Sequence, residues 1–342
     1  MHAPCSPSDG RRSVSLNGKS QVNRVRKLII DADPGIGSAL ALLAAMQDSE
    51  VDLLAITATA GRVDAAQASN NIQALVDLFD PPKRPRIGWA AENLSNMPSL
   101  PDEPCSALLN GKLGLGDVNF RPPTPHHRVD SHKMIAELVR EYPNEITLLT
   151  LGPLTNIARV NDYNHGILQK LHEIVIVGGN HHHCGDITPA AEFNFFADPL
   201  SARTVLTVPA TKTLVPLDVS EKVELTFEMY SSWCGESQTP IGQLLAEMLS
   251  SYFRSHRQLL GRESIPIREM VGLAVAARPL TAESRQIAVD VETQGKLTRG
   301  MSIFDDRTHP TWKPNVEIIT ALDSQGVLDY CRSMLRGCRE PK

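Results

Sequence analysis

Short apolar strands alternate with helical segments along the first half of the chain, and this alternation constrains the fold more than any other feature of the sequence. The predicted strands cover 26–31, 51–58, 86–88, 146–151 and 174–177, and helical spacing of apolar residues predicts helices over 39–46, 65–79, 134–140 and 153–160. Repeated β-then-α units form a parallel sheet with helices on both faces. The sequence therefore predicts an α/β fold with an open, mostly parallel, doubly wound sheet.

The domain organisation follows from length and from the absence of linkers. At roughly 150 residues per domain, 342 residues nominally correspond to two domains. The sequence contains no internal repeat, no low-complexity tract and no mid-chain linker, so we expect one domain over 26–335. Residues 225–262 read as a helical insertion, and 287–318 return to short strands. Residues 1–25 read as a flexible leader that lacks the apolar core of a secretory signal.

Composition excludes several classes of protein. Lys and Arg number 34 against 39 Asp and Glu, for a net charge of −5, which argues against a nucleic acid partner. The apolar stretches are far shorter than the ~20 residues that a membrane span requires. The six cysteines are scattered with no Cys-x-x-Cys pair, as is typical of reduced thiols in a cytoplasmic protein.

Two carboxylates, Asp31 and Asp33, follow the first predicted strand, at the sheet edge where open α/β folds bind ligands. There they could bind a hard cation or act as a general base. Alternatively, Asp33 could cap the helix that follows. The nearby Gly35 and Gly37 are not followed by a third glycine at the required spacing, so no nucleotide cofactor is expected.

The segment 27–35 resembles the amino-terminal signature of the inosine/uridine-preferring nucleoside hydrolase family, which runs Asp-x-Asp-Pro-Gly-x-Asp-Asp. Further segments match that family in the same order. They are the Gly-Pro-Leu-Thr-Asn run within 151–158, the Gly-Gly and Glu-Phe-Asn elements of 178–199, and 216–219 and 297–301. The resemblance covers about 27–330.

The resemblance implies a calcium ion at the strand ends and a water that cleaves the N-glycosidic bond of a ribonucleoside. Carried over by position, Asp33 is the metal ligand and base, and Asp31 supports it. The backbone carbonyl of Leu151 is a further metal ligand, and Glu192 and Asn194 bind ribose hydroxyls.

The sequence departs from the family at positions that the resemblance assigns to the site. Gly37 and Ser38 replace the Asp-Asp pair, which removes one metal carboxylate and one that grips the sugar. Met270 and Val271 replace a His-Asp pair, which removes a leaving-group histidine and a second acidic ligand. The family's calcium is therefore expected to bind weakly if present, because only Asp33 remains as a carboxylate ligand.

Three more candidate substrate-binding residues stand at substituted positions. Arg62 follows Gly61 where the family has asparagine, Asn110 replaces a histidine, and Asp186 replaces the asparagine of the ribose loop. If Arg62 points inward, its guanidinium could stand in for the missing cation; otherwise it is a solvated surface residue.

Two histidine clusters remain. His181, His182, His183 and Cys184, with Asp186 nearby, could form a substitute metal site, although neighbouring side chains in an extended loop diverge and a polar cleft rim explains them as well. The pair at 126–127 lies in a proline-rich loop and carries less weight.

Two functions remain open. One is a hydrolase of ribonucleosides or related N-ribosides with reduced or altered activity. The other is a catalytically inactive family member that binds a ribose-containing or sugar ligand, or serves as a regulatory or assembly subunit. In both cases the partner is a small molecule, and the family leads us to expect a homodimer or homotetramer.

Overall fold

The computed structural model describes residues 25–91, 105–116, 118, 128–233, 239–278 and 282–338. Within these residues the main sheet has nine strands in the order β10-β13-β7-β6-β5-β1-β2-β3-β4. Every neighbouring pair is parallel except β10 and β13, which are antiparallel. The predicted open, mostly parallel sheet is confirmed. The expected leader lies outside the described residues, apart from residue 25.

The strands of this sheet are β1 (Arg26–Ala32), β2 (Val51–Ala58), β3 (Arg86–Trp89), β4 (Val129–Asp130), β5 (Ile146–Thr150), β6 (Glu173–Val177), β7 (Lys212–Val215), β10 (Ala282–Ile287) and β13 (Val316–Leu322). Two short antiparallel pairs lie outside it, namely β8 (Glu224–Thr226) with β9 (Ser264–Pro266), and β11 (Val289–Val291) with β12 (Ser302–Phe304).

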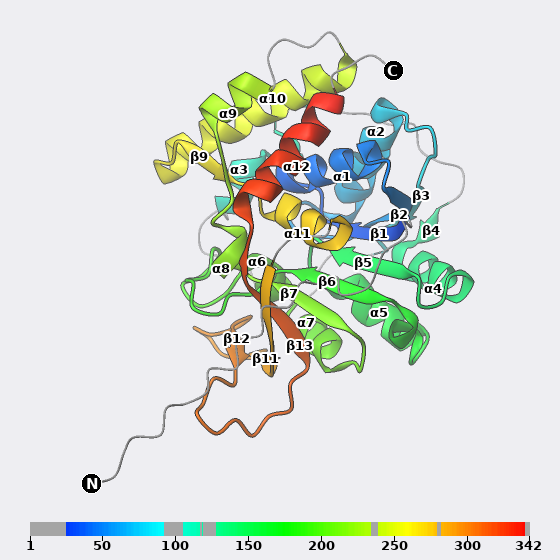
Figure 1. Ribbon diagram of the computed structural model, residues 1–342, viewed down its shortest axis with the longest axis vertical. Coiled ribbons are helices and arrows are strands. Elements are labelled where there is room, and N and C mark those ends of the chain that lie inside the picture. Colours follow the sequence, from blue (N-terminus) through cyan, green and yellow to red (C-terminus); the bar gives the residue numbers. More distant parts are fainter. Residues whose placement is uncertain are drawn as a thin grey trace.

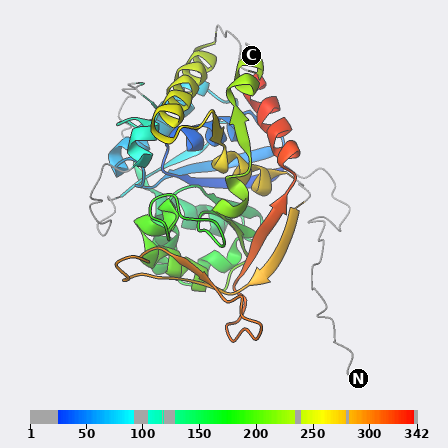
Figure 2. The same cartoon turned by 90° about the vertical axis from the view of Figure 1, so that its left-hand side faces the viewer.

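Helices cover both faces of the sheet (Figures 1 and 2). One face carries α1 (Ile36–Gln47), α2 (Ala65–Phe79), α10 (Pro240–Ser255), α11 (Arg268–Ala277) and α12 (Ser324–Gly337). The other carries α4 (Ser131–Glu141), α5 (Thr155–Tyr163), the short η1 (Ile167–Lys170) and α7 (Pro199–Thr207). The remaining helices are α3 (Cys105–Asn110), α6 (Phe193–Ala197), α8 (Leu217–Ser220), α9 (Phe227–Trp233) and η2 (His256–Leu260).

Alternating side chains of the strands build two apolar cores. In β1, Leu28 and Ile30 face the α1 side, whereas Ile29 faces the α4 side, and all three are buried. A strand buried on both faces is continuously apolar, which is why the sequence signal of β1 was clear.

Helix α1 begins three residues earlier than the sequence predicted. Gly35 is extended, and the side-chain oxygen of the distant Asn110 accepts a hydrogen bond from the Ile36 N–H at 2.8 Å. This contact satisfies a backbone donor of the first turn from outside the segment, so Gly37 and Ser38 lie in the helix.

Helices α9 and α10 with η2 confirm the predicted helical insertion, which lies between β8 and β9. Among the described residues, no helix combines the length and apolar character that crossing a membrane would require.

Close packing of α11 on β6 yields a stability prediction. A Cβ added at Gly272 would lie 2.2 Å from Cγ2 of Val177. We expect Gly272→Ala to lower the free energy of unfolding by about 1–3 kcal/mol through overpacking. Urea denaturation followed by circular dichroism measures the change. The double variant with Val177→Ala should lose less than the sum of the two single variants, and strict additivity would contradict the assigned contact.

Candidate functional site

The candidate site lies where the chain reverses its direction of travel across the sheet. From β1 the chain builds outward through β2, β3 and β4, and then returns to the other side of β1 with β5, β6 and β7. Ligands bind at such a switch point, outside the carboxyl ends of the strands. The loops after β1, β2, β5 and β6 meet there.

Asp31, the penultimate residue of β1, is fully buried and ties neighbouring elements together. Its Oδ1 accepts hydrogen bonds from Thr57 Oγ1 at 2.5 Å and from Asn156 Nδ2 at 2.8 Å. Burial raises the pKa of Asp31 to about 7, against the opposing effect of those two hydrogen bonds. Oδ2 has no hydrogen-bond partner among the described residues.

Asp33 is seated between two glycines. Added Cβ atoms would come within 2.2 Å of Asp33 Oδ2 at Gly61 and within 2.9 Å of Oδ1 at Gly152. Oδ2 accepts a hydrogen bond from the Arg62 N–H at 2.9 Å, and Oδ1 is buried without a partner in the described residues. Burial raises the pKa of Asp33 to about 7, while the charge of Arg62 lowers it.

The alternative that Asp33 caps helix α1 is wrong. The N-cap residue is Gly35, without a side-chain hydrogen bond. The Asp33 carboxylate reaches instead to the loop after β2. The spacing of residues within 31–38 could not predict this contact, because Arg62 reaches Asp33 only through the pairing of β1 with β2.

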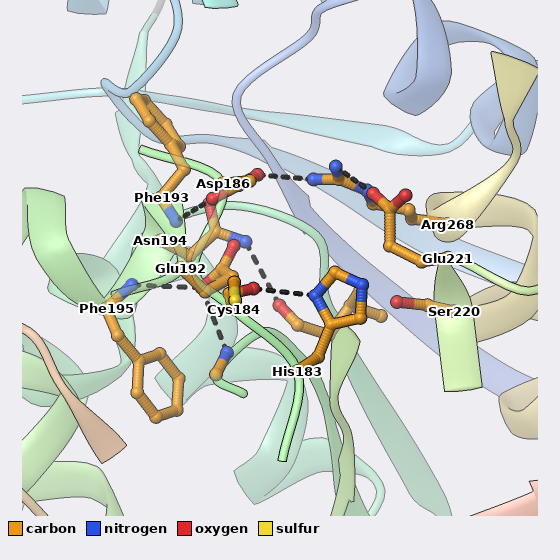
Figure 3. Close-up of polar contacts among 12 residues, drawn as sticks. His183, Cys184, Asp186, Glu192, Phe193, Asn194, Phe195, Ser220, Glu221 and Arg268 are labelled. Atoms are coloured by element: carbon orange, nitrogen blue, oxygen red, sulfur yellow. Dashed lines mark hydrogen bonds and ion pairs between the residues drawn. The ribbon is translucent and has the colours of Figure 1, made fainter. Parts of the chain in front are cut away.

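The side chains of Glu192 and Asn194 form hydrogen bonds with backbone groups in this structure (Figure 3). Glu192 Oε2 accepts hydrogen bonds from the N–H groups of Gly179 and Phe195, at 3.0 and 3.2 Å. The Asn194 amide donates to the carbonyl oxygens of Leu151 and Val177, at 3.2 and 3.0 Å, and its own Oδ1 is buried without a partner in the described part of the chain. Burial, together with the charge of Asp186, raises the pKa of Glu192 to about 7.

A cleft of about 280 Å³ opens beside these residues. Segments far apart in the sequence form its wall, and we refer to it below as the cleft. It is lined by Arg62, Leu109, His183, Gly185, Asp186, Ile187, Phe193, Glu221, Tyr252, His256, Leu260, Arg262, Pro266, Arg268 and Glu269. Of the catalytic and substrate-binding candidates from the sequence, Arg62 and Asp186 line the cleft, whereas Asp31, Asp33, Glu192, Asn194 and Asn110 do not. His183 of the histidine cluster also lines it.

One wall of the cleft is a network of paired charges (Figure 3). Arg268, the first residue of α11, forms ion pairs with both Asp186 and Glu221, and Asp186 also accepts a hydrogen bond from the Phe193 N–H at 2.8 Å. Burial lowers the pKa of Arg268, but the two carboxylates outweigh it and raise the pKa above its usual value. Asp186 therefore connects the start of α11 to the backbone at Phe193, the first residue of α6.

Glu269, the next residue of α11, was not a candidate from the sequence. It is buried, and its carboxylate fills the space beside Gly37, where an added Cβ would lie 2.2 Å from Glu269 Oε2. A carboxylate from α11 thus lies beside the position where the family has an aspartate and this chain has Gly37. Only tertiary contact reveals this, because 232 residues separate the two positions.

Arg62 points inward, as one sequence alternative held. Its guanidinium lies 4.7 Å from the ring centre of Phe193 and lines the cleft. Burial lowers its pKa, and the charges of Asp33 and Glu269 more than offset that effect and raise it. Tyr252 stands in the same cleft, and burial together with Glu269 raises its pKa to about 12.

A calcium ion would find few of its usual ligands here. Calcium prefers about six to eight oxygens, with carboxylates among them. Asp33 Oδ2 is engaged by Arg62, the Leu151 carbonyl accepts from Asn194, and Val271 is buried and apolar. Ser38 offers a buried hydroxyl oxygen without a partner in the described residues. With a guanidinium already beside Asp33, these donors do not fit calcium held by several carboxylates.

The histidine loop has a different arrangement from the one considered above. Backbone N–H groups of His181, His182 and His183 all donate to the Asp218 carboxylate. The ring nitrogens of His181 and His182 gather with Asp306, not with Asp186 or Cys184.

One contact disfavours a metal at that cluster. The Arg285 guanidinium hydrogen-bonds to Asp306 at 2.7 Å, and a bound guanidinium repels a cation. The His181 and His182 ring centres lie 3.7 Å apart, with the ring planes inclined by 39°. The histidine pair at 126–127 lies outside the described residues.

Comparison of the chain with known protein families and structures agrees with this fold and with the motifs. The family model of the inosine-uridine preferring nucleoside hydrolases matches residues 28–329. The protein is thus an α/β protein of the nucleoside hydrolase class. The chain belongs to the inosine-uridine preferring nucleoside hydrolase family.

Relatives resemble the chain along most of its length. Uridine nucleosidase 1 of Arabidopsis thaliana is 31% identical over 320 residues, covering 90% of this chain and 93% of the relative. The pyrimidine-specific ribonucleoside hydrolase RihA of Shewanella sp. (strain MR-4) is 31% identical over 307 residues, covering 89% and 94%. The structure of a purine-preferring ribonucleoside hydrolase from Gardnerella vaginalis superposes with a TM-score of 0.83 at 26% identity, covering 92% of this chain and 99% of that one.

The raised pKa of Asp31 predicts a pH effect on stability. From its unfolded value of 3.8 up to about 7, the folded protein holds a proton on Asp31 that the unfolded chain has released. Stability contributed by this group therefore falls as pH rises through that window, by at most about 1.4 kcal/mol per pH unit.

Asp31→Asn removes this titration, so its unfolding free energy should fall less steeply than that of the parent protein between about pH 5 and pH 7. Urea unfolding in chelator-containing buffers measures both slopes. The exposed Asp329→Asn is the control and should keep the parent slope. Parallel curves for Asp31→Asn and the parent would refute the assignment.

Proposed function

We propose that this protein binds the ribose of an N-riboside in the cleft and hydrolyses its N-glycosidic bond, with Asp33 as the general base. The observation that carries the proposal is the buried Asp33 carboxylate at the strand ends, with Oδ1 unpartnered among the described residues and a pKa near 7. A base with a pKa near neutrality can both take and release a proton in each turnover. Membership of the nucleoside hydrolase family supports the same chemistry.

In the proposed reaction, a water oxygen attacks the anomeric carbon while the bond from that carbon to the base nitrogen breaks. The nitrogen keeps the bonding electrons, and the water proton passes to Asp33. Positive charge develops on the sugar ring, and an ionised carboxylate close to the ring stabilises such charge.

In this scheme the leaving base does not obtain its proton from the family's histidine position. Met270 and Val271 are both buried and carry no titratable group, and they occupy the positions of the family's His-Asp pair. We therefore propose turnover slower than expected for the family, and no requirement for calcium. Uridine is the first substrate to test, because two relatives are a uridine nucleosidase and a pyrimidine-specific ribonucleoside hydrolase.

One observation favours a second function, binding of a riboside without turnover. Asp33 is 0% exposed and does not line the cleft, whereas Arg62 does. Unless Arg62 shifts, attacking water reaches Asp33 only through a buried path.

Ribose release from uridine and inosine, measured with the full-length protein, tests the proposal. Asp33→Asn should lower the rate about 100-fold or more, since a general base contributes at least that factor. Asp329→Asn, an exposed carboxylate on α12, should retain the parent rate. Rates in chelator and in added calcium should be equal.

A riboside that binds but releases no ribose would establish the second function instead. Unaltered turnover in Asp33→Asn would remove Asp33 from the reaction. A rate that rises from zero with calcium would contradict the metal-free scheme.

A further inference from the structure

Two opposite charges, those of Arg62 and Glu269, stand in the cleft. The Arg62 guanidinium and the Glu269 carboxylate both line it. Neither side chain makes a hydrogen bond or an ion pair with any residue in the described part of the chain, although each feels the charge of the other. The other charged groups that line the cleft, Asp186, Glu221, Arg262 and Arg268, form ion pairs with one another.

The Glu269 carboxylate is held in place by its surroundings. Arg268 is locked by two ion pairs, which fixes the first turn of α11, and the helix N-terminus there favours a carboxylate. The missing side chain of Gly37 leaves the space that the carboxylate fills. Helix α11 therefore holds the Glu269 carboxylate, which can only accept hydrogen bonds, at the cleft.

Contacts to Asp33 and to Phe193 fix the position of the Arg62 guanidinium. The backbone N–H of Arg62 is bound to Asp33, and the guanidinium packs on the Phe193 ring. Its Cδ would lie 3.0 Å from a Cβ at Gly35, so the side chain crosses directly over the loop after β1. A fixed positive charge thus lies beside the Asp33 carboxylate.

The pair selects a particular ligand chemistry. A guanidinium can only donate hydrogen bonds, and an ionised carboxylate can only accept them. A hydroxyl does both, so two neighbouring hydroxyls can accept from Arg62 and donate to Glu269 at once. Neighbouring hydroxyls on one face of a sugar ring match this requirement, whereas a simple anion would be repelled by Glu269.

We propose that Arg62 and Glu269 together form a metal-free site for the vicinal diol of a ribosyl ligand. Arg62 supplies the positive charge beside Asp33, and Glu269 replaces the sugar-binding carboxylate absent at Gly37. This inference deepens the proposed function and rests on its assignment of the cleft to ribosides, but it requires binding only, not bond cleavage.

Pseudouridine is the probe that separates binding from hydrolysis. Its base is joined to ribose through a carbon–carbon bond, so it can occupy the cleft without being cleaved. Calorimetric titration in chelator should show binding with the same affinity as in added calcium. Glu269→Gln and Arg62→Gln should each weaken it at least about tenfold, since each loses a hydrogen bond to a charged group.

Comparison with 2′-deoxypseudouridine identifies the contact. The parent protein should bind the deoxy probe at least about tenfold more weakly. In Glu269→Gln this difference should largely disappear, because the lost hydroxyl and the lost charge belong to one interaction. Glu247→Gln and Arg254→Gln, exposed residues of α10, are matched controls and should bind both probes as the parent does. Thermal melting confirms that every variant is folded.

Moving the carboxylate from position 269 to position 37 tests whether the two side chains occupy the same space. Gly37→Asp alone should abolish binding of pseudouridine, because its Cβ would meet Glu269 Oε2 at 2.2 Å. Gly37→Asp combined with Glu269→Ala should restore binding, since one carboxylate then replaces the other. Equal binding by Gly37→Asp and the parent would contradict the shared space.

Three outcomes would overturn the proposed diol site. They would not decide whether the protein is a hydrolase, which the measurement of ribose release tests separately. The three are binding that requires calcium, parent-like affinity in both Arg62→Gln and Glu269→Gln, and no binding of pseudouridine to the parent. Conversely, binding as predicted with no ribose release from uridine would uphold the diol site and reject the hydrolase.

Discussion

A single buried carboxylate, Asp31, joins the elements on which the site depends. It lies at the end of the central strand β1 and accepts hydrogen bonds from Thr57 on β2 and Asn156 on α5. Asn156 in turn donates to the carbonyl of Ala58 at 2.8 Å. A buried polar group is stable only when its partners are in place, so this network sets the relative position of two strands and one helix. The loop that carries Asp33 leaves β1 from that fixed point.

The arrangement of charge in the cleft follows from the same constraint. Asp33 is buried between glycines, and the strong cost of an isolated buried carboxylate is reduced by a backbone N–H and by the guanidinium of Arg62. Glu269 then balances Arg62 without touching it closely enough for an ion pair. The cleft thus contains a fixed donor and a fixed acceptor.

Much of the fold could be predicted from local patterns. The bounds of β2 and α2 agree with the predicted segments, and β1, β3, β5 and β6 agree to within one residue, because strands buried on both faces have continuous apolar runs. The start of α1 was predicted three residues too late, since its first turn depends on Asn110. The candidates Asp31, Asp33, Asp186 and Arg62 do come together at one edge of the sheet.

The sequence by itself determined the alternation of strands and helices, the carboxyl-end loops as the place for chemistry, and the family through its ordered motifs. Only the tertiary structure decided which side chains share the cleft. Glu269, Tyr252 and Arg268 come from the end of the helical insertion and from α11, and no local pattern relates them to Gly37 or Arg62. The physical reason is that periodicity reports which face of an element is buried, whereas the neighbour of a buried charge is set by packing between elements distant in sequence.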